Sequence, residues 1–175
     1  MPETNASGWT IHYETHGDPA GPPLLMTLGL SHRLAHWGRL REMLAERLFV
    51  VSFDCRGMGA SERRDEPYAV ADETEDMAAV LDAVGLPASA VYGRSRGGML
   101  AQEFALRYPD RVTALILSGT HFGGPDVLPA TKRVNAAMQL RPEMTRDQIF
   151  ETQNEAMAAP GWPERDPEAF AYCLA

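Results

Sequence analysis

The sequence predicts an α/β fold in which a mostly parallel sheet is flanked by helices. Three observations support this prediction. Short apolar runs alternate with helix-type patterns through residues 9–120, as in chains whose parallel strands are joined by crossover helices. Most of these runs are nearly continuously apolar, which is typical of strands buried on both faces of a sheet. The composition, 45% hydrophobic and 23% charged over 175 residues, is that of a folded chain with a full core.

Five strands are expected. The first, at residues 9–17, alternates apolar and polar side chains, as an exposed strand does. A proline- and glycine-rich turn at 18–23 separates it from the next run. The other four strands are short apolar runs, which cover residues 24–30, 48–54, 88–93 and 112–120.

Three helices are expected between these strands, because apolar side chains recur there three and four residues apart. They cover residues 36–47, 72–84 and 96–108. Gly85 is expected to end the second helix, and Pro109 follows the third. The chain therefore alternates strand and helix up to about residue 120.

The remainder has a different character. After a glycine- and proline-rich stretch, three helical patterns follow without a strand candidate, at residues 131–140, 145–159 and 166–175. We expect Thr145 and Asp166 to cap the second and third of these helices, with Pro167 as a first helical residue. The predicted division is a core at residues 1–128 and a helical segment at 129–175.

Five apolar side chains of the helical segment share a predicted face. Two interpretations are open and compatible: packing within a small core, which apolar helical spacing usually marks, or the lining of a substrate pocket. The side chains are Met138, Met144, Phe150, Met157 and Trp162.

Charge and targeting signals limit the partners. Sixteen basic and 24 acidic side chains give a net charge of −8, which argues against nucleic acid as a partner, because phosphate binding needs a basic surface. No apolar run approaches the roughly 20 residues that cross a bilayer, and the first residues lack a secretory pattern. We therefore expect no membrane partner and a cytoplasmic location. Cys55 and Cys173 have no metal-type or redox spacing and are expected to be buried or half-buried thiols.

Ser95 is the candidate nucleophile. It lies in the pattern Gly93-Arg94-Ser95-Arg96-Gly97, between a predicted strand and a predicted helix. This is the context of a nucleophile elbow, where a serine stands on a strained turn and glycines let strand and helix approach closely. The helix directs its first N–H groups toward the reaction centre. The Arg96 N–H is therefore a candidate donor to an oxyanion.

A second oxyanion donor is expected after an earlier strand. Gly29 permits a turn at the end of the 24–30 run, and the N–H of Leu30 is the candidate. Arg94 and Arg96 leave two alternatives open. They narrow the substrate range toward an anionic group, or they are solvated or paired with nearby carboxylates, as surface charges usually are.

Taken together, these motifs resemble the α/β-hydrolase superfamily over roughly residues 8–125. The resemblance rests on residues 24–37, on an Asp-x-Arg-Gly-x-Gly-x-Ser loop at 54–61, on the elbow and its helix at 91–112, and on 114–120. It implies a hydrolase core, a helical cap at 129–175, a structural role for the loop at 54–61, and no metal or organic cofactor. The chain departs from the family's frequent pattern where Leu28 replaces a histidine and arginines flank the serine.

The catalytic base is not apparent. In this family an acid and then a histidine follow the serine, and the histidine follows the last strand. His121 comes too early, and the other histidines, at positions 12, 16, 32 and 36, precede Ser95. The pattern implies two further strands that carry these groups. We consider three explanations: one fragment of a longer or split protein, a truncated product, or a site completed by association.

An unpaired apolar strand at 114–120 is an aggregation hazard. We therefore expect a complementary C-terminal chain or a homo-oligomer. The predicted function is a serine hydrolase of a small ester, lactone or related acyl compound, through a Ser95 acyl-enzyme, with acid and histidine from a segment absent from this chain. The alternative is a catalytically inactive fragment or ligand-binding protein on the same fold.

Overall fold

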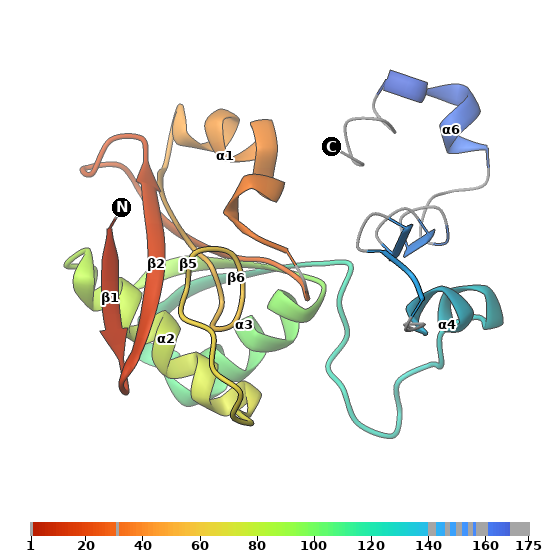
Figure 1. The fold of residues 1–175 in the computed structure, drawn as a ribbon. Helices are drawn as coiled ribbons and strands as arrows, with labels where there is room; N and C mark the ends of the chain where they lie inside the picture. The colour runs from red at the N-terminus through yellow and green to blue at the C-terminus, as the bar shows by residue number, and fades with distance from the viewer. Residues whose placement is uncertain are drawn as a thin grey trace. The chain divides into compact units, whose positions relative to one another are not determined.

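The computed structural model describes residues 2–30, 32–139, 143–145, 148–149, 152–153, 156 and 161–168. The chain divides into two units, Met1–Pro125 and Asp126–Ala175. The larger unit holds the whole sheet, and Figure 1 shows it as a ribbon.

A six-stranded sheet forms the centre of the larger unit, in the order β1-β2-β4-β3-β5-β6. The pairs β3–β4, β3–β5 and β5–β6 are parallel, while β1–β2 and β2–β4 are antiparallel. The predicted mostly parallel α/β sheet is therefore confirmed. The strands are β1 (Glu3–Ala6), β2 (Trp9–His16), β3 (Pro23–Thr27), β4 (Phe49–Phe53), β5 (Ser89–Arg94) and β6 (Val112–Ser118).

Strand β1 was not expected from the sequence. Its residues are mostly polar and show no alternation that would predict a strand. It forms because Ser7 and Gly8, both at positive φ (48° and 88°), make a tight turn that pairs Ala6 with Trp9. Such two-residue turns match the twist of a hairpin. The Ser-Gly pair was the available signal.

Helices cover both faces of the sheet, as Figure 1 shows, with α1 on one face and α2 and α3 on the other. The three predicted helices are confirmed with shifts of one to a few residues at their ends, and a short 3₁₀ turn precedes α1. The elements are η1 (Leu34–Trp37), α1 (Gly38–Ala45), α2 (Val70–Ala83), α3 (Arg96–Arg107) and η2 (Pro109–Arg111).

Alternation along the strands divides the core into two layers. Leu25, Val51 and Val91 are paired neighbours that face α2 and α3, where they pack with Phe104. Leu24, Met26 and Val50 belong to the opposite layer, which includes Trp37. Apolar side chains pack on both faces of β3 and β4. This packing holds the ends of the two strands in place, and the loops that approach Ser95 begin there.

Strand β6 is different, because it lies at the edge of the sheet and pairs only with β5 among the described strands. Its apolar side chains Leu115, Ile116 and Leu117 are exposed. The predicted apolar edge is therefore present. Its unpaired backbone groups are available to a further strand.

The smaller unit contains helix α4 (Lys132–Met138) and the single turn α6 (Trp162–Arg165). Thr131 caps α4 by accepting from the Val134 N–H. The predicted cap at Thr145 is confirmed, since its hydroxyl accepts from the Gln148 N–H and its own N–H donates to that side chain.

Three of the five side chains on the predicted apolar face of the smaller unit lie within the described residues. Phe150, Met157 and Cys173 lie outside the described residues. Met138 is exposed, and Met144 and Trp162 are half-buried. The boundary after residue 128 and the role of 129–175 as a cap stay predictions.

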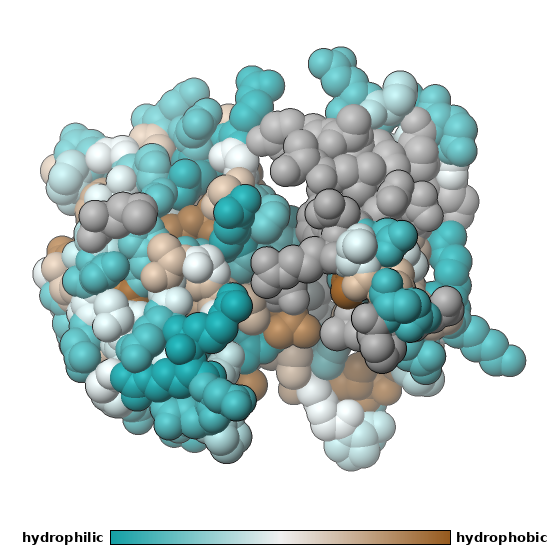
Figure 2. Space-filling model, viewed as in Figure 1, coloured by the Kyte–Doolittle hydropathy of each residue, from teal (hydrophilic) through white to brown (hydrophobic). Residues whose placement is uncertain are grey.

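On the face shown in Figure 2, hydrophilic side chains predominate over the larger unit, and hydrophobic ones form small separate patches. No helix within the described parts of the chain is long and apolar enough to cross a bilayer. Most apolar side chains of this unit instead fill the two layers beside the sheet.

Candidate active site

Ser95 stands between β5, which ends at Arg94, and α3, which begins at Arg96. Its backbone has φ 55° and ψ −125°, a conformation that non-glycine residues rarely adopt. The Ser95 N–H donates to the Ser118 carbonyl of β6, and its carbonyl accepts from the Gly98 N–H, both at 2.9 Å. Backbone strain of this kind persists only where neighbouring structure enforces it, and it is common at active sites.

Glycines make this turn possible because strand and helix backbones meet there. A β-carbon added at Gly93 would lie 2.5 Å from the Gly97 carbonyl oxygen. One added at Gly97 would lie 2.4 Å from the carbonyl oxygen of Thr27 and 2.5 Å from that of Leu28. Any larger residue would push α3 away from the ends of β3 and β5.

Gly29 brings the loop after β3 against Ser95. A β-carbon added at Gly29 would lie 3.0 Å from the Ser95 Cβ and 3.3 Å from its Oγ. The Gly29 carbonyl accepts from the His32 N–H at 3.3 Å. Because the peptide is trans, the Leu30 N–H points to the side opposite that bond. Leu30 is 52% exposed and takes no part in the core.

Asp54 holds two loops beside the elbow. Its Oδ1 accepts from the Leu34 N–H at 2.7 Å, and its Oδ2 accepts from the Ala60 N–H at 2.9 Å. Gly59 passes so close that an added β-carbon would lie 2.1 Å from Oδ2. The carboxylate is buried and occupied by backbone donors. Its expected structural role is therefore confirmed.

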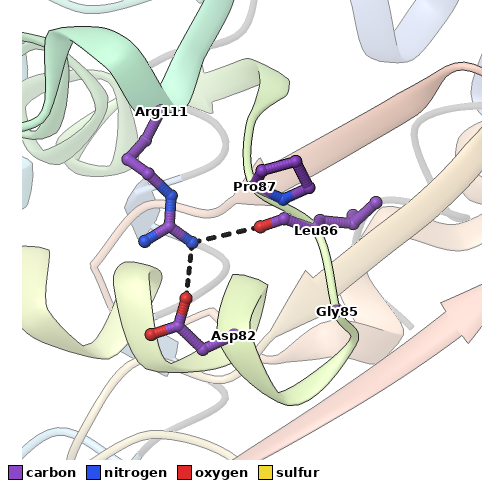
Figure 3. Close-up of a pocket in the computed structure, with 5 residues that line it drawn as sticks. All are labelled: Asp82, Gly85, Leu86, Pro87 and Arg111. Carbon is purple, nitrogen blue, oxygen red and sulfur yellow. Dashed lines mark hydrogen bonds and ion pairs between the residues drawn. The ribbon is translucent and has the colours of Figure 1, made fainter.

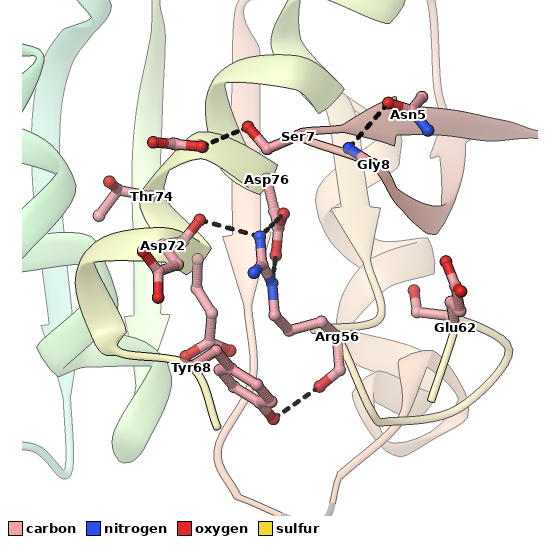
Figure 4. A network of polar contacts seen from close by, with 12 residues as sticks. Asn5, Ser7, Gly8, Arg56, Glu62, Tyr68, Asp72, Thr74 and Asp76 are labelled. Atoms are coloured by element: carbon pink, nitrogen blue, oxygen red, sulfur yellow. Dashed lines mark hydrogen bonds and ion pairs between the residues drawn. The ribbon is translucent and has the colours of Figure 1, made fainter. Parts of the chain in front are cut away.

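Arg56 is likewise structural. Figure 4 shows it among α2 residues: its guanidinium donates to Asp76 at 2.8 and 2.5 Å and to the Asp72 carbonyl at 3.0 Å. The ring of Trp9 lies 4.8 Å from the guanidinium carbon, and Tyr68 donates to the Arg56 carbonyl at 3.0 Å. These contacts join β2, the loop at 54–61 and α2, and none of them is made with Ser95.

The two arginines beside Ser95 have different surroundings. Arg96 pairs with Glu73 of α2 through both terminal guanidinium nitrogens. Burial lowers the pKa of Arg96, but hydrogen bonds and charge from Glu73 outweigh it and leave that pKa raised. Arg94 is exposed, and its side chain has no hydrogen-bond or ion-pair partner among the described residues. Pairing with a carboxylate therefore holds for Arg96, whereas for Arg94 both alternatives from the sequence, a role toward an anionic substrate group and simple solvation, stay predictions.

Glu73 was missed at the level of sequence, although a signal was present. It lies four residues before Met77, on the same helical stripe that carries the buried Val80 and Leu81. A carboxylate on the buried stripe of a helix needs a cation, because an unpaired buried charge is strongly unfavourable.

None of the histidines makes a hydrogen bond with the Ser95 hydroxyl in the described part of the chain. His12 is buried against the Pro2 carbonyl, and His121 accepts from the Gly123 N–H. His32 lies in the loop after β3 and His36 in η1, with their rings 5.0 Å apart. The described residues also contain no group of three His, Cys, Asp or Glu side chains arranged to hold a metal ion.

An open pocket of about 510 Å³ lies elsewhere, lined by Asp82, Gly85, Leu86, Pro87 and Arg111. Figure 3 shows Arg111 donating to the Asp82 carboxylate and the Leu86 carbonyl. Four of these residues precede the start of β5, and Arg111 precedes the start of β6, which runs parallel to β5; Ser95 follows the end of β5. The pocket is therefore at the opposite end of that strand from the candidate nucleophile.

Comparison with known proteins yields consistent matches. A family model described as alpha/beta hydrolase fold matches residues 22–165. A putative carbamate hydrolase RutD of Azorhizobium caulinodans is 36% identical over 67% of this chain and 43% of its own length. The 3-oxoadipate enol-lactonase 2 of Acinetobacter baylyi is 29% identical over 90% of this chain and 58% of its own. The chain thus spans about half the length of these relatives.

A solved structure has the same fold as this chain. The enol-lactonase from Burkholderia xenovorans LB400 superposes on 99% of this chain and 66% of its own, with a TM-score of 0.76 and 24% identity. At that identity the match concerns the fold alone.

Proposed function

Because the chain belongs to the α/β-hydrolase fold family, we propose that it is a serine hydrolase acting on a small ester, lactone or related acyl compound. The observation that carries the proposal is the elbow itself. Ser95 is held at φ 55° at the start of α3, with Gly29 packed against its side chain. This arrangement exposes the Ser95 hydroxyl beside two backbone segments, the loop after β3 and the start of α3, that can supply N–H donors.

The proposed reaction forms and breaks one acyl bond on the enzyme. The Ser95 Oγ attacks the acyl carbon, and the carbonyl oxygen becomes an oxyanion held by the N–H groups of Arg96 and Leu30. The base takes the serine proton and gives it to the leaving oxygen as the bond to the acyl carbon breaks. Water then attacks the acyl-enzyme, which releases the acid and restores the hydroxyl.

The base in this proposal is a histidine, oriented by an acid, on a segment outside these 175 residues. Two observations support that assignment. No described histidine reaches Ser95, and β6, whose Ser118 carbonyl accepts from Ser95, presents an unpaired apolar edge. A complementary chain segment, or a second copy of this chain, would pair with that edge.

The substrate class is supported by the relatives. One is named for hydrolysis of a carbamate and another for opening of an enol-lactone. Both substrates contain a carbonyl carbon bonded to an electronegative leaving atom, which is what an activated serine attacks. The mechanism uses no metal or organic cofactor, and the cytoplasmic location stays a prediction.

The test is hydrolysis of small nitrophenyl esters and lactones by the natively purified protein, with native mass measurement of any accompanying polypeptide. We expect Ser95-dependent turnover in a preparation that includes a partner bearing an aspartate and a histidine, or a second copy. A single 19.2 kDa chain without turnover on any of these compounds would instead favour the inactive or ligand-binding alternative.

A further inference from the structure

A fully buried carboxylate lies behind the nucleophile elbow without a part in the reaction proposed above. The Glu73 side chain is 0% exposed. Glu73 belongs to α2, 22 residues before Ser95 in the sequence. A buried carboxylate is strongly unfavourable unless a cation and hydrogen bonds compensate it. The position therefore requires a particular partner.

That partner is the residue that follows the nucleophile. The two terminal nitrogens of Arg96 each donate to a different carboxylate oxygen of Glu73, one of them at 3.1 Å. Such a two-point contact fixes the plane of the guanidinium as well as its position. A single-point ion pair would leave the side chain free to rotate.

Fixing this side chain bears on the backbone of the elbow. Arg96 is the first residue of α3, and its N–H is the donor that the proposed mechanism directs at the oxyanion. The first N–H groups of a helix have no acceptor within the helix, so hydrogen bonding inside the helix does not orient them. Ser95, immediately before, has a strained backbone that needs external support.

We propose that Glu73 is a positioning residue that acts through Arg96: the buried bidentate pair holds the first turn of α3 so that the Arg96 N–H faces the oxyanion. The inference rests on the proposed function of Ser95. In this proposal the Arg96 side chain is bound to Glu73, and only the Arg96 backbone faces the substrate.

The same helix offers a matched control. Glu103 and Arg107 form an ion pair at 2.5 Å near the other end of α3, and both side chains are partly exposed. Glu73→Gln and Glu103→Gln make the same chemical change in a buried and an exposed pair. Glu73→Asp keeps the charge and shortens the side chain, so it serves as the conservative variant.

The experiment measures ester hydrolysis and inhibition by a trifluoromethyl ketone, which adds to the serine as a tetrahedral oxyanion. For Glu73→Gln we expect kcat to fall about 10- to 100-fold, with KM within twofold. This loss is smaller than the roughly 100- to 1000-fold effect of removing an oxyanion donor, because the Arg96 N–H is displaced and not removed. The inhibition constant should rise by the same factor as kcat/KM falls. Glu73→Asp should recover part of the loss, and Glu103→Gln should change none of these values by more than twofold.

A merely structural role gives a different pattern. If Glu73→Gln lowers the melting temperature but the folded enzyme keeps its kcat and its inhibition constant, the positioning role is wrong while Ser95 remains the nucleophile. If Glu73→Gln folds poorly, a second variant, Arg96→Lys, keeps the test open. The lysine retains a charge contact with Glu73 but loses the two-point geometry, so the backbone amides of residues 96–98 should exchange their hydrogens faster than in the unsubstituted protein. Unchanged exchange there would also overturn the proposal. If Ser95→Ala retains turnover, the proposed function fails with it.

Discussion

Strands β3 and β6 both border β5, yet one is enclosed and the other is open. Leu25 of β3 and Leu115 of β6 are both register partners of Val91, on its two sides. Leu25 is 0% exposed and Leu115 is 40% exposed. The same residue type against the same neighbour thus meets opposite environments. The sheet is therefore closely packed on the side of β5 where the Gly29 loop meets Ser95, and open on the side where we propose that the acid and the base lie.

The largest expected effect is the loss of turnover when Ser95, the candidate nucleophile on the packed side of β5, is replaced. Ser95→Ala should reduce turnover by about 10⁴-fold or more, because the remaining groups only bind and polarise the substrate. Steady-state hydrolysis of a nitrophenyl ester measures it, with circular dichroism as the control for folding. Activity within tenfold of the unsubstituted protein would contradict the assignment.

The next effect concerns a thiol on the packed side. Burial, and then the charge of Glu73, raise the pKa of Cys55 to about 12, and Thr27 is its neighbour at 3.7 Å. The Cys173→Ser change leaves Cys55 as the single thiol to be measured. At pH 8, Cys55 in the folded protein should react with a disulfide reagent about a thousandfold more slowly than Cys55 in the unfolded protein, because only the thiolate attacks. Its rate should still increase with pH above 9, where an ordinary thiol levels off. Equal native and unfolded rates would show that Cys55 is accessible.

The comparison itself is tested by two truncations. Leu25→Ala should lower the free energy of unfolding by about 3 kcal/mol, since it leaves a cavity in a closed core. Leu115→Ala should cost less than about 1 kcal/mol in the chain alone, because its side chain is already partly hydrated. Denaturant titration measures both.

A partner on β6 would sharpen this result. Once a complementary segment covers the edge, Leu115→Ala should become more costly, approaching Leu25→Ala. Equal costs in the chain alone would mean that β6 is already covered, and the account of the open edge would be wrong.

The smallest effect belongs to an exposed ion pair. Glu103→Gln should change the free energy of unfolding by no more than about 0.5 kcal/mol, because surface pairs within a helix contribute little. Thermal unfolding at low and high salt measures it. A loss of several kcal/mol would show that the end of α3 depends on this pair more than its exposure indicates.

Much of the fold followed from local patterns. The buried runs around Leu25 and Val51 and the Gly-x-Ser-x-Gly turn at Ser95 each carry their signal within a few residues, so strands, helices and elbow could be predicted. Strand β1 could not, because pairing with β2 imposes it on polar residues. Glu73 became visible only when α2 and α3 were placed together, since its partner lies 23 positions away.

Local patterns do not predict the acid and the base of the proposed reaction, because in our proposal they lie on a segment that pairs beside β6. In the described part of the chain, no histidine makes a hydrogen bond with the Ser95 hydroxyl. The nucleophile is therefore the part of the site that can be tested now.

The most direct measurement is the location of a covalent adduct. The natively purified protein, with any polypeptide that accompanies it, is treated with a fluorophosphonate, digested and sequenced by mass spectrometry. The account predicts a single adduct on Ser95 that is lost in Ser95→Ala. Labelling of another residue, or none on Ser95 while a known serine hydrolase in the same tube is labelled, would contradict it.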